Sequence, residues 1–388
     1  MYATFYELFQ KLFGIDIPAL SLIKVFGFFF ALAFLVAAYF LASEFKRLEK
    51  AGFIPSWTEK TIIGGGVKWS EVLINAFVGF VLGYKILFAL LNWSDFIRNS
   101  EAYIANTNGN MLGGLLGALL YGAYVYYNQK KAALPQPKVI EAQVYPHTRV
   151  FDLVILAAVF GILGAKFFSF FEYWDVFLQD PIGHLLSFSG LNFYGGLIVA
   201  AIALAVYAKR KNIPLLRFMD STAPALIIAY GVGRLGCHFS GDGDWGIVNS
   251  APKPSFLPNW LWALHYPNNV AREGVPIPGC EGPYCFVLDP PVYPTSVYEF
   301  FMALAIFGIL WSLRKKLTPI PGILFAIYMV LNGIERFCIE TIRVNDRYDV
   351  LGFQLSQAQS IAILLVTLGI ILGIFVYQRS KKNPLGTV

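Results

Sequence analysis

The side chains best suited to chemistry in this sequence lie in residues 231–246, which read GVGRLGCHFSGDGDWG. An apolar run precedes them and places Arg234 at a boundary between membrane and water. A charge at that depth is costly without a partner and therefore indicates function. Asp242 and Asp244 follow among glycines, which permit sharp turns and close backbone approach. The pattern predicts a guanidinium beside two carboxylates; a structural salt bridge at a helix end is the alternative.

A second polar cluster, NGIERFCIETIRVNDRYD, occupies residues 332–349. On a helix, Arg336, Glu340 and Arg343 fall at i, i+4 and i+7 and share one face. Arginines that converge at one membrane surface suit a phosphate, because each guanidinium can bind it through two parallel hydrogen bonds. We expect Glu340 to hold an arginine in position. The alternative is an ion-pair network between helices that binds no ligand.

Further side chains are candidates for acid–base chemistry. Tyr194 lies in NFYGGLI at the start of a predicted span, where it could hydrogen-bond a phosphate, act as an acid or base, or be an interfacial aromatic residue. His238 could act as a base near neutral pH, or be a polar residue at a helix end. Tyr298 and Glu299 open a later span, and we interpret them as the start of a helix.

The elements that carry these residues must be membrane helices. The chain has 388 residues, 57% hydrophobic and 14% charged, and is far more apolar than a soluble domain. We therefore predict an all-α, polytopic membrane protein with about nine transmembrane helices of roughly 20 residues each. The expected spans are 20–42, 72–92, 111–128, 150–172, 191–209, 219–237, 297–313, 321–339 and 357–378.

Basic residues cluster on one side of these spans, which argues against nucleic acid as a partner. The clusters are Lys46, Arg47, Lys50, Lys60 and Lys68; Lys130, Lys131, Lys138 and Arg149; Lys209, Arg210, Lys211 and Arg217; Arg314, Lys315 and Lys316; and Arg379, Lys381 and Lys382. Because basic loops stay in the cytoplasm, we expect the N-terminus outside, the C-terminus inside and residues 238–296 as an external loop region. In that loop, Cys280 and Cys285 predict a small disulfide.

The chain contains an internal repeat, in which residues 72–131 form an extra hairpin resembling residues 153–211. Matched positions are Gly83 and Gly164, Lys85 and Lys166, Gly113 and Gly195, and Gly114 and Gly196. We otherwise treat residues 1–388 as a single membrane domain. A duplicated hairpin with lysines inside its spans also suits a rival function, a membrane transporter or lipid flippase, whose site would lie near the bilayer midplane.

Four motifs together resemble the prolipoprotein diacylglyceryl transferases of bacterial inner membranes. GRLGCHFSGDGDWG is similar to the family's GR-x-GN signature, FYGGLI to F-H-GGLI, YPTSVYEF to HP-[ST]-x-x-YE, and RFCIETIR to RF-x-x-EF-x-R. The motifs also follow the family's order. The likeness spans about residues 20–42 and 150–379, so the first hairpin resembles an insertion, and the long external loop resembles the variant found in Bacteroidetes.

The resemblance implies an enzyme that transfers the diacylglyceryl group of phosphatidylglycerol to the lipobox cysteine of a preprolipoprotein. The products would be a thioether and glycerol phosphate. The implied location is the bacterial inner (cytoplasmic) membrane with the site toward the periplasm, and no cofactor or metal is implied. Arg234 and Arg336 match the family's essential arginines, and we expect both to bind the lipid phosphate. The other expected substrate-binding positions are Glu340, Arg343, Gly195, Gly196, Asp244 and Gly246.

The sequence departs from the family pattern at positions relevant to acid–base chemistry. The departures are Tyr194 and Tyr293 in place of histidines, Cys237 in place of an asparagine, and Asn332 in place of a tyrosine. Asp242 stands where the family's signature loop has a glutamate. The candidates for the general base are therefore Tyr194, His238 and Asp242, in no firm order.

Overall fold

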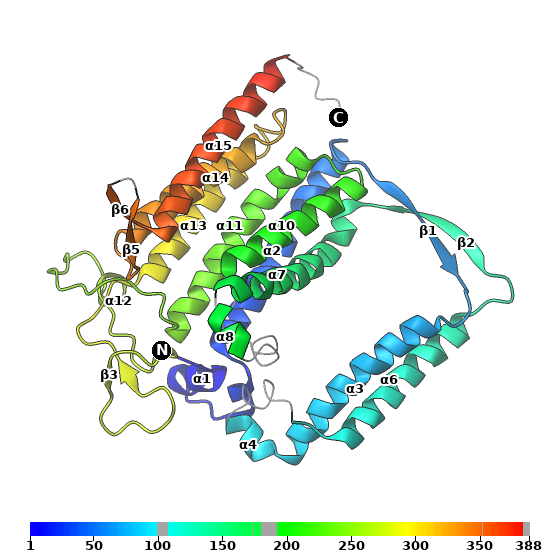
Figure 1. Ribbon diagram of the computed structural model, residues 1–388, viewed down its shortest axis with the longest axis horizontal. Coiled ribbons are helices and arrows are strands. Elements are labelled where there is room, and N and C mark those ends of the chain that lie inside the picture. Colours follow the sequence, from blue (N-terminus) through cyan, green and yellow to red (C-terminus); the bar gives the residue numbers. More distant parts are fainter. Residues whose placement is uncertain (99–107, 173, 180–191, 351, 383–388) are drawn as a thin grey trace. The chain divides into compact units, whose positions relative to one another are not determined.

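The computed structural model describes residues 1–98, 108–172, 174–179, 192–350 and 352–382 (Figure 1). The helices are α1 (Phe5–Phe13), η1 (Pro18–Leu22), α2 (Val25–Lys50), α3 (Trp69–Leu91), α4 (Trp93–Arg98), α6 (Met111–Ala132), η2 (Pro146–Arg149), α7 (Val150–Glu172), α8 (Trp174–Gln179), α10 (Phe193–Arg210), α11 (Leu215–Ser240), α12 (Asn259–Trp262), α13 (Thr295–Leu313), α14 (Ile323–Glu340) and α15 (Gln357–Lys382). The strands are β1 (Trp57–Ile63), β2 (Lys138–Val144), β3 (Val275–Pro276), β4 (Phe286–Val287), β5 (Arg347–Val350) and β6 (Phe353–Ser356).

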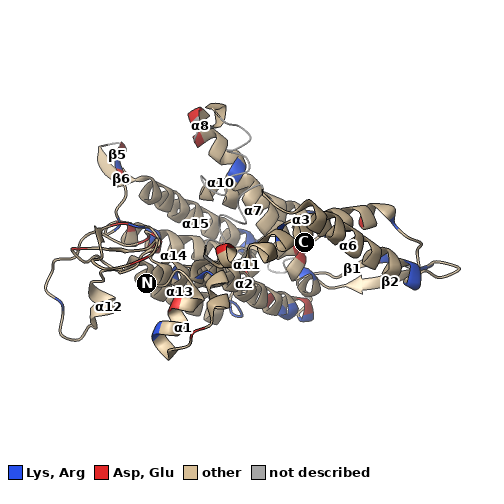
Figure 2. Cartoon of the chain, turned by 90° about the horizontal axis from the view of Figure 1, so that it is seen from below, with Lys and Arg blue, Asp and Glu red and all other residues tan. Residues whose placement is uncertain are grey.

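The predicted all-α, multi-pass fold is confirmed. Within the described ranges, seven helices are long and apolar enough to cross a membrane, and each coincides with an expected span. The two remaining expected spans, 111–128 and 321–339, form α6 and α14. Glu335, Arg336 and Glu340 lie within α14, so this 18-residue helix carries three charged residues. Most of the helical ribbon in Figure 2 is tan, so charged residues are sparse along it.

The chain divides into two compact units. The first comprises Met1–Pro55, Pro146–Ala157 and Ile202–Val388, and the second comprises Ser56–Tyr145 and Ala158–Ala201. The expectation of a single membrane domain stays a prediction.

In the first unit, α11 packs against α2 and α13, and α14 packs against α15. Small residues allow the close approach: a Cβ on Gly236 would lie 2.9 Å from the Cβ of Phe29 in α2. The glycines at positions 231, 233 and 236 lie inside α11 and form no turn. The buried residues that join α11, α13 and α14 are Ala223, Ile227, Ala303, Ile306, Leu310 and Leu324.

One end of this unit carries several of the basic clusters. Glu44, which is buried in α2, accepts from Arg47 Nε at 3.0 Å and lies 3.3 Å from Arg314 Nε. Arg217 at the start of α11 donates to the backbone oxygen of Thr318, whose hydroxyl accepts from Arg47. Three basic clusters that are distant in the sequence therefore meet at one end of the helices. The predicted orientation depends on basic residues gathering on one side of the spans, and these contacts agree with that pattern. The orientation itself stays a prediction.

The second unit contains the hairpin of α3 and α6, together with an antiparallel ribbon of β1 and β2. Strand pairing runs from Trp57 opposite Val144 to Ile63 opposite Lys138. We did not expect this ribbon, because its two strands are separated in the sequence by the whole hairpin and no short turn joins them.

The two hairpins share local details. A Cβ on Gly83 would lie 2.2 Å from a carbonyl oxygen of α6, and one on Gly164 would lie 2.6 Å from a carbonyl oxygen of α10. An asparagine also precedes each second helix, and its side chain accepts from a backbone N–H three residues later, at 2.9 Å for Asn110 and 2.7 Å for Asn192. These parallels are of the kind a duplication produces, and the duplication stays a prediction.

Candidate functional site

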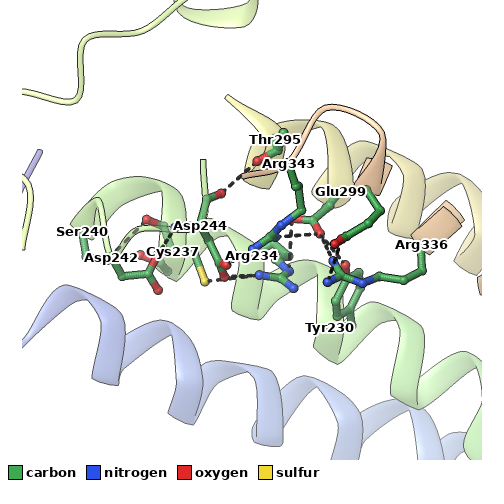
Figure 3. A network of polar contacts seen from close by, with 12 residues as sticks. Tyr230, Arg234, Cys237, Ser240, Asp242, Asp244, Thr295, Glu299, Arg336 and Arg343 are labelled. Carbon is green, nitrogen blue, oxygen red and sulfur yellow. Dashed lines mark hydrogen bonds and ion pairs between the residues drawn. The ribbon is translucent and has the colours of Figure 1, made fainter. Parts of the chain in front are cut away.

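Helices α11 and α14 present their arginines to a single carboxylate on α13. Glu299 has a fully buried side chain, with 0% exposure, in the second turn of α13. Its oxygens lie 3.3 Å from Arg234 Nε and accept from Arg336 Nη1 at 3.3 Å (Figure 3). Tyr230, one turn before Arg234, donates its hydroxyl to Glu299 at 3.0 Å. The two arginines expected to act together therefore do lie together.

A third arginine and a second carboxylate complete the network. Asp244 accepts from Arg234 Nη1 and from Arg343 Nη2. Arg343 Nη1 also donates to Glu299 at 3.4 Å. Arg234 and Arg343 are thus each shared by the same two carboxylates. Burial would raise the pKa of Asp244, but the charges of the two guanidiniums outweigh this effect and lower the pKa to about 2.

Glu340 holds Arg336 as the helical spacing predicts. Its Oε2 lies 3.0 Å from Arg336 Nη2 in an i,i+4 pair, and its side chain is 1% exposed. Asn345 donates to the other carboxylate oxygen of Glu340. The expected contact between these two residues of α14 is present, and its part in substrate binding stays a prediction.

The loop that carries Asp242 and Asp244 is shaped by glycines with positive φ. Gly241 ends α11 at φ 66°, and Gly243 has φ 104°, values that other residues rarely adopt. The Thr295 hydroxyl donates to the backbone oxygen of Asp244 at 2.9 Å and ties the loop to the start of α13.

The far end of this loop is clamped between two backbone segments. Gly246 N donates to Tyr293 O at 2.8 Å, and Ile247 N donates to Ile342 O at 2.8 Å. A Cβ on Gly246 would lie 2.5 Å from Ile342 O, so only glycine fits without movement. This geometry places Gly246 where it sets the path of the loop; its contact with substrate stays a prediction.

Asp242 lies beside the network rather than within its ion pairs. One potential ligand atom each from Cys237, Asp242 and Asp244 lies within 4.8 Å of the others, so these residues could in principle hold a metal ion. Two guanidiniums already bind Asp244, however, and their charge disfavours a cation there. Burial first, and then the negative charge of Asp244, raise the pKa of Asp242. A carboxylate with a raised pKa is a better proton acceptor.

His238 is directed toward aromatic residues. Its Nδ1 lies 3.3 Å from the hydroxyl of Tyr266, a side chain that is 1% exposed and packs against Trp245. The hydroxyl is a hydrogen-bond partner that the sequence did not indicate.

Tyr194, Gly195 and Gly196 belong to the second unit, at the start of α10. A Cβ on Gly195 would lie 2.4 Å from the Cβ of Phe168, and one on Gly196 would lie 2.8 Å from Gly161 O. Both glycines therefore allow close helix packing. The roles of these three residues in catalysis and binding stay predictions.

Sequence reasoning missed Glu299, which we interpreted only as part of a helix start. It also missed Tyr230 and Glu335, which lie beside the network. The Tyr230 hydroxyl is 3.5 Å from Glu335 Oε1. The available signal was a glutamate within an otherwise apolar span, which is costly to bury without a cationic partner.

Comparisons with known proteins agree with these motifs. The sequence profile of the family described as "Prolipoprotein diacylglyceryl transferase" matches residues 131–375, more than half of the chain. A protein of Staphylococcus aureus (strain MRSA252) is 30% identical over 251 residues, which cover 64% of this chain and 80% of that protein. A second, from S. aureus (strain bovine RF122 / ET3-1), is 28% identical over 251 residues with the same coverage. Both are named "Phosphatidylglycerol--prolipoprotein diacylglyceryl transferase".

Proposed function

The chain belongs to the prolipoprotein diacylglyceryl transferase family, and we propose that it transfers the diacylglyceryl group of phosphatidylglycerol to the lipobox cysteine of prolipoproteins. It is a multi-pass membrane enzyme, a transferase of lipoprotein biosynthesis. The rival interpretation as a transporter or flippase rested on the duplicated hairpin and on the lysines within its spans. The family match and the arginine network at the helix ends favour the transferase.

In the reaction, the cysteine sulfur attacks the glycerol carbon that carries the phosphate. A carbon–sulfur bond forms, the carbon–oxygen bond to phosphate breaks, and the bonding electrons leave with the oxygen as glycerol phosphate. The thiol proton passes to a base, since the thiolate is the nucleophile. The phosphate thereby gains a second negative charge, and a site rich in fixed cations stabilises that charge as it develops.

We assign the lipid phosphate to Arg234, Arg336 and Arg343. The observation that carries this assignment is the meeting of Arg234 and Arg336 on Glu299, from two helices that are distant in the sequence. Fixed carboxylates keep the guanidiniums oriented before the lipid arrives, which reduces the reorganisation needed in the transition state. Among the three candidates for the base, Asp242 is favoured by its raised pKa and its position beside Asp244.

The proposed location is the inner membrane of a bacterium, with the site toward the periplasm. Glu299 and Arg314 lie 15 residues apart on and just after α13, about 22 Å along a helix axis. The arginine network therefore lies at the opposite end of this helix from the basic cluster around Glu44. If the basic end faces the cytoplasm, as the positive-inside rule predicts, the network faces outward.

The test of this function is direct transfer by purified protein. We expect incubation with phosphatidylglycerol and a lipobox peptide to add the mass of a diacylglyceryl group to the peptide, detected by mass spectrometry. Arg234→Ala and Arg336→Ala, in protein whose folding is verified by size-exclusion chromatography and circular dichroism, should lose the product. Full activity in both variants would remove the assigned roles, and no transfer by the unmodified chain would remove the function.

A further inference from the structure

Arg234 and Arg343 are bridged by two carboxylates that differ in how firmly they are fixed. Glu299 comes from a helix, is completely buried and also accepts from Tyr230. Asp244 comes from a loop, and its side chain is 29% exposed. The two carboxylates lie on different sides of the guanidiniums in Figure 3. Of the two side chains, that of Asp244 is the more exposed.

The ion pairs of the network are electrically balanced, and the carboxyl groups of Glu335 and Asp242 lie beside these pairs. Its three cations are Arg234, Arg336 and Arg343, and its three carboxylates are Asp244, Glu299 and Glu340. A phosphodiester brings one more negative charge into a largely buried site, where an uncompensated charge is costly. Binding therefore favours the release of one carboxylate.

Asp244 is the carboxylate best able to leave. Glu340 is 1% exposed and is held by Arg336 and Asn345, and Glu299 is completely buried. The Asp244 segment instead contains Gly241 and Gly243, whose backbone can rotate more freely than that of other residues. Two side chains hold the Asp244 backbone: the Thr295 hydroxyl donates to its oxygen at 2.9 Å, and its N–H donates to Asp242 Oδ1 at 3.3 Å.

We propose that the Asp244 carboxylate occupies the place of the lipid phosphate, and that phosphatidylglycerol binds by displacing it while Glu299 stays as the fixed counter-ion. The inference rests on the proposed function. A carboxylate and a phosphodiester each offer two oxygens to a pair of guanidiniums, so one can replace the other. Protein in which Asp244 still binds the arginines cannot bind the lipid phosphate. The apparent lipid affinity is therefore reduced in proportion to the fraction of protein in which Asp244 has moved away.

The proposal predicts opposite effects for the two carboxylates. The measurement is isothermal titration of detergent-solubilised protein with dioctanoylphosphatidylglycerol, without peptide so that no turnover occurs. Asp244→Asn should bind at least about fivefold more tightly than the unmodified chain, or about 1 kcal/mol. Glu299→Gln should bind more weakly, because it removes the charge that orients the arginines. Asp346→Asn, a change at an exposed aspartate beyond α14, is the matched control and should leave the affinity unchanged.

Neutral dioctanoylglycerol should bind Asp244→Asn and the unmodified chain equally, because it has no phosphate. Equal or weaker binding of phosphatidylglycerol by folded Asp244→Asn would overturn the proposal. If that variant does not fold, Thr295→Val removes the loop anchor and should also tighten binding; an unchanged or weaker affinity would count equally against displacement. Failure of the unmodified chain to bind or transfer the lipid would instead reject the proposed function.

Discussion

Replacement of Arg234 and Arg336 by lysine, singly and together, tests whether the two arginines act as one unit. Lysine keeps the positive charge but offers one nitrogen in place of the planar fork of arginine. Arg234 directs Nε toward Glu299 and Nη1 toward Asp244, and Arg336 directs Nη1 toward Glu299 and Nη2 toward Glu340. Each lysine can therefore keep only one of the two contacts of the arginine it replaces.

The size of the effect follows from that loss. A hydrogen bond to a charged group contributes about 1.5–3 kcal/mol, so each single variant should lose roughly 10- to 150-fold in kcat/KM. Because both arginines contact Glu299, their effects should not add: residues in one network show interaction energies of about 0.5–3 kcal/mol. We expect the double variant to lose less than the product of the two single losses, by at least about twofold.

The assay is the initial rate of peptide lipidation at several concentrations of phosphatidylglycerol, with folding verified for every variant. Arg347→Lys, at an exposed position in β5, is the matched control and should retain full activity. Losses in the double variant that equal the product of the single losses would refute the shared network. Full activity in both single variants would refute the requirement for the forked geometry.

Three further predictions concern the loop after α11. The plot of kcat/KM against pH should fall on its acidic side with a midpoint above the ordinary pKa of aspartate, because the pKa of Asp242 is raised. Asp242→Asn should remove this acidic decline and slow turnover about 10²- to 10⁴-fold. An acidic decline that persists in Asp242→Asn would reject Asp242 as the base. The lowered pKa of Asp244, about 2, stabilises the folded state above the unfolded pKa of about 3.9, and this contribution of about 1–2 kcal/mol is lost as pH falls toward 2. Thermal unfolding of the unmodified chain should therefore shift more between pH 6 and pH 3 than that of Asp244→Asn, and equal shifts would contradict the assignment. Gly246→Ala should lower the unfolding temperature, at a cost of about 1–3 kcal/mol, because its Cβ would lie 2.5 Å from Ile342 O; an unchanged temperature would contradict the clamp.

Much of the helical architecture could be predicted because a membrane imposes a simple rule on sequence. Every expected span coincides with a helix, since a bilayer requires about 20 apolar residues with their backbone groups paired internally. The β1–β2 ribbon was not predictable in this way, because its pairing joins segments on either side of a complete hairpin. The strands of such a ribbon carry no short turn signal in the sequence.

The two arginines were identifiable because a charge within an apolar segment is rare, and the contact of Arg336 with Glu340 followed from helical spacing. Glu299 was missed for a physical reason as well. Its role depends on three helices that meet, and a single helix start gives no sign of which arginines its carboxylate will face. The spacing of residues along one helix predicts contacts on that helix only.

The composition of the network argues that it serves the reaction more than the stability of the fold. Buried ion pairs often contribute little to stability, because the cost of removing charges from water offsets their attraction. The apolar contacts among α11, α13 and α14, such as Ile227 and Leu310, are the better source of stability for this bundle. What three guanidiniums and a fixed Glu299 do provide is a set of oriented donors before any lipid arrives. A leaving phosphate that gains charge needs such donors, and a bundle held together only by apolar side chains would not provide them.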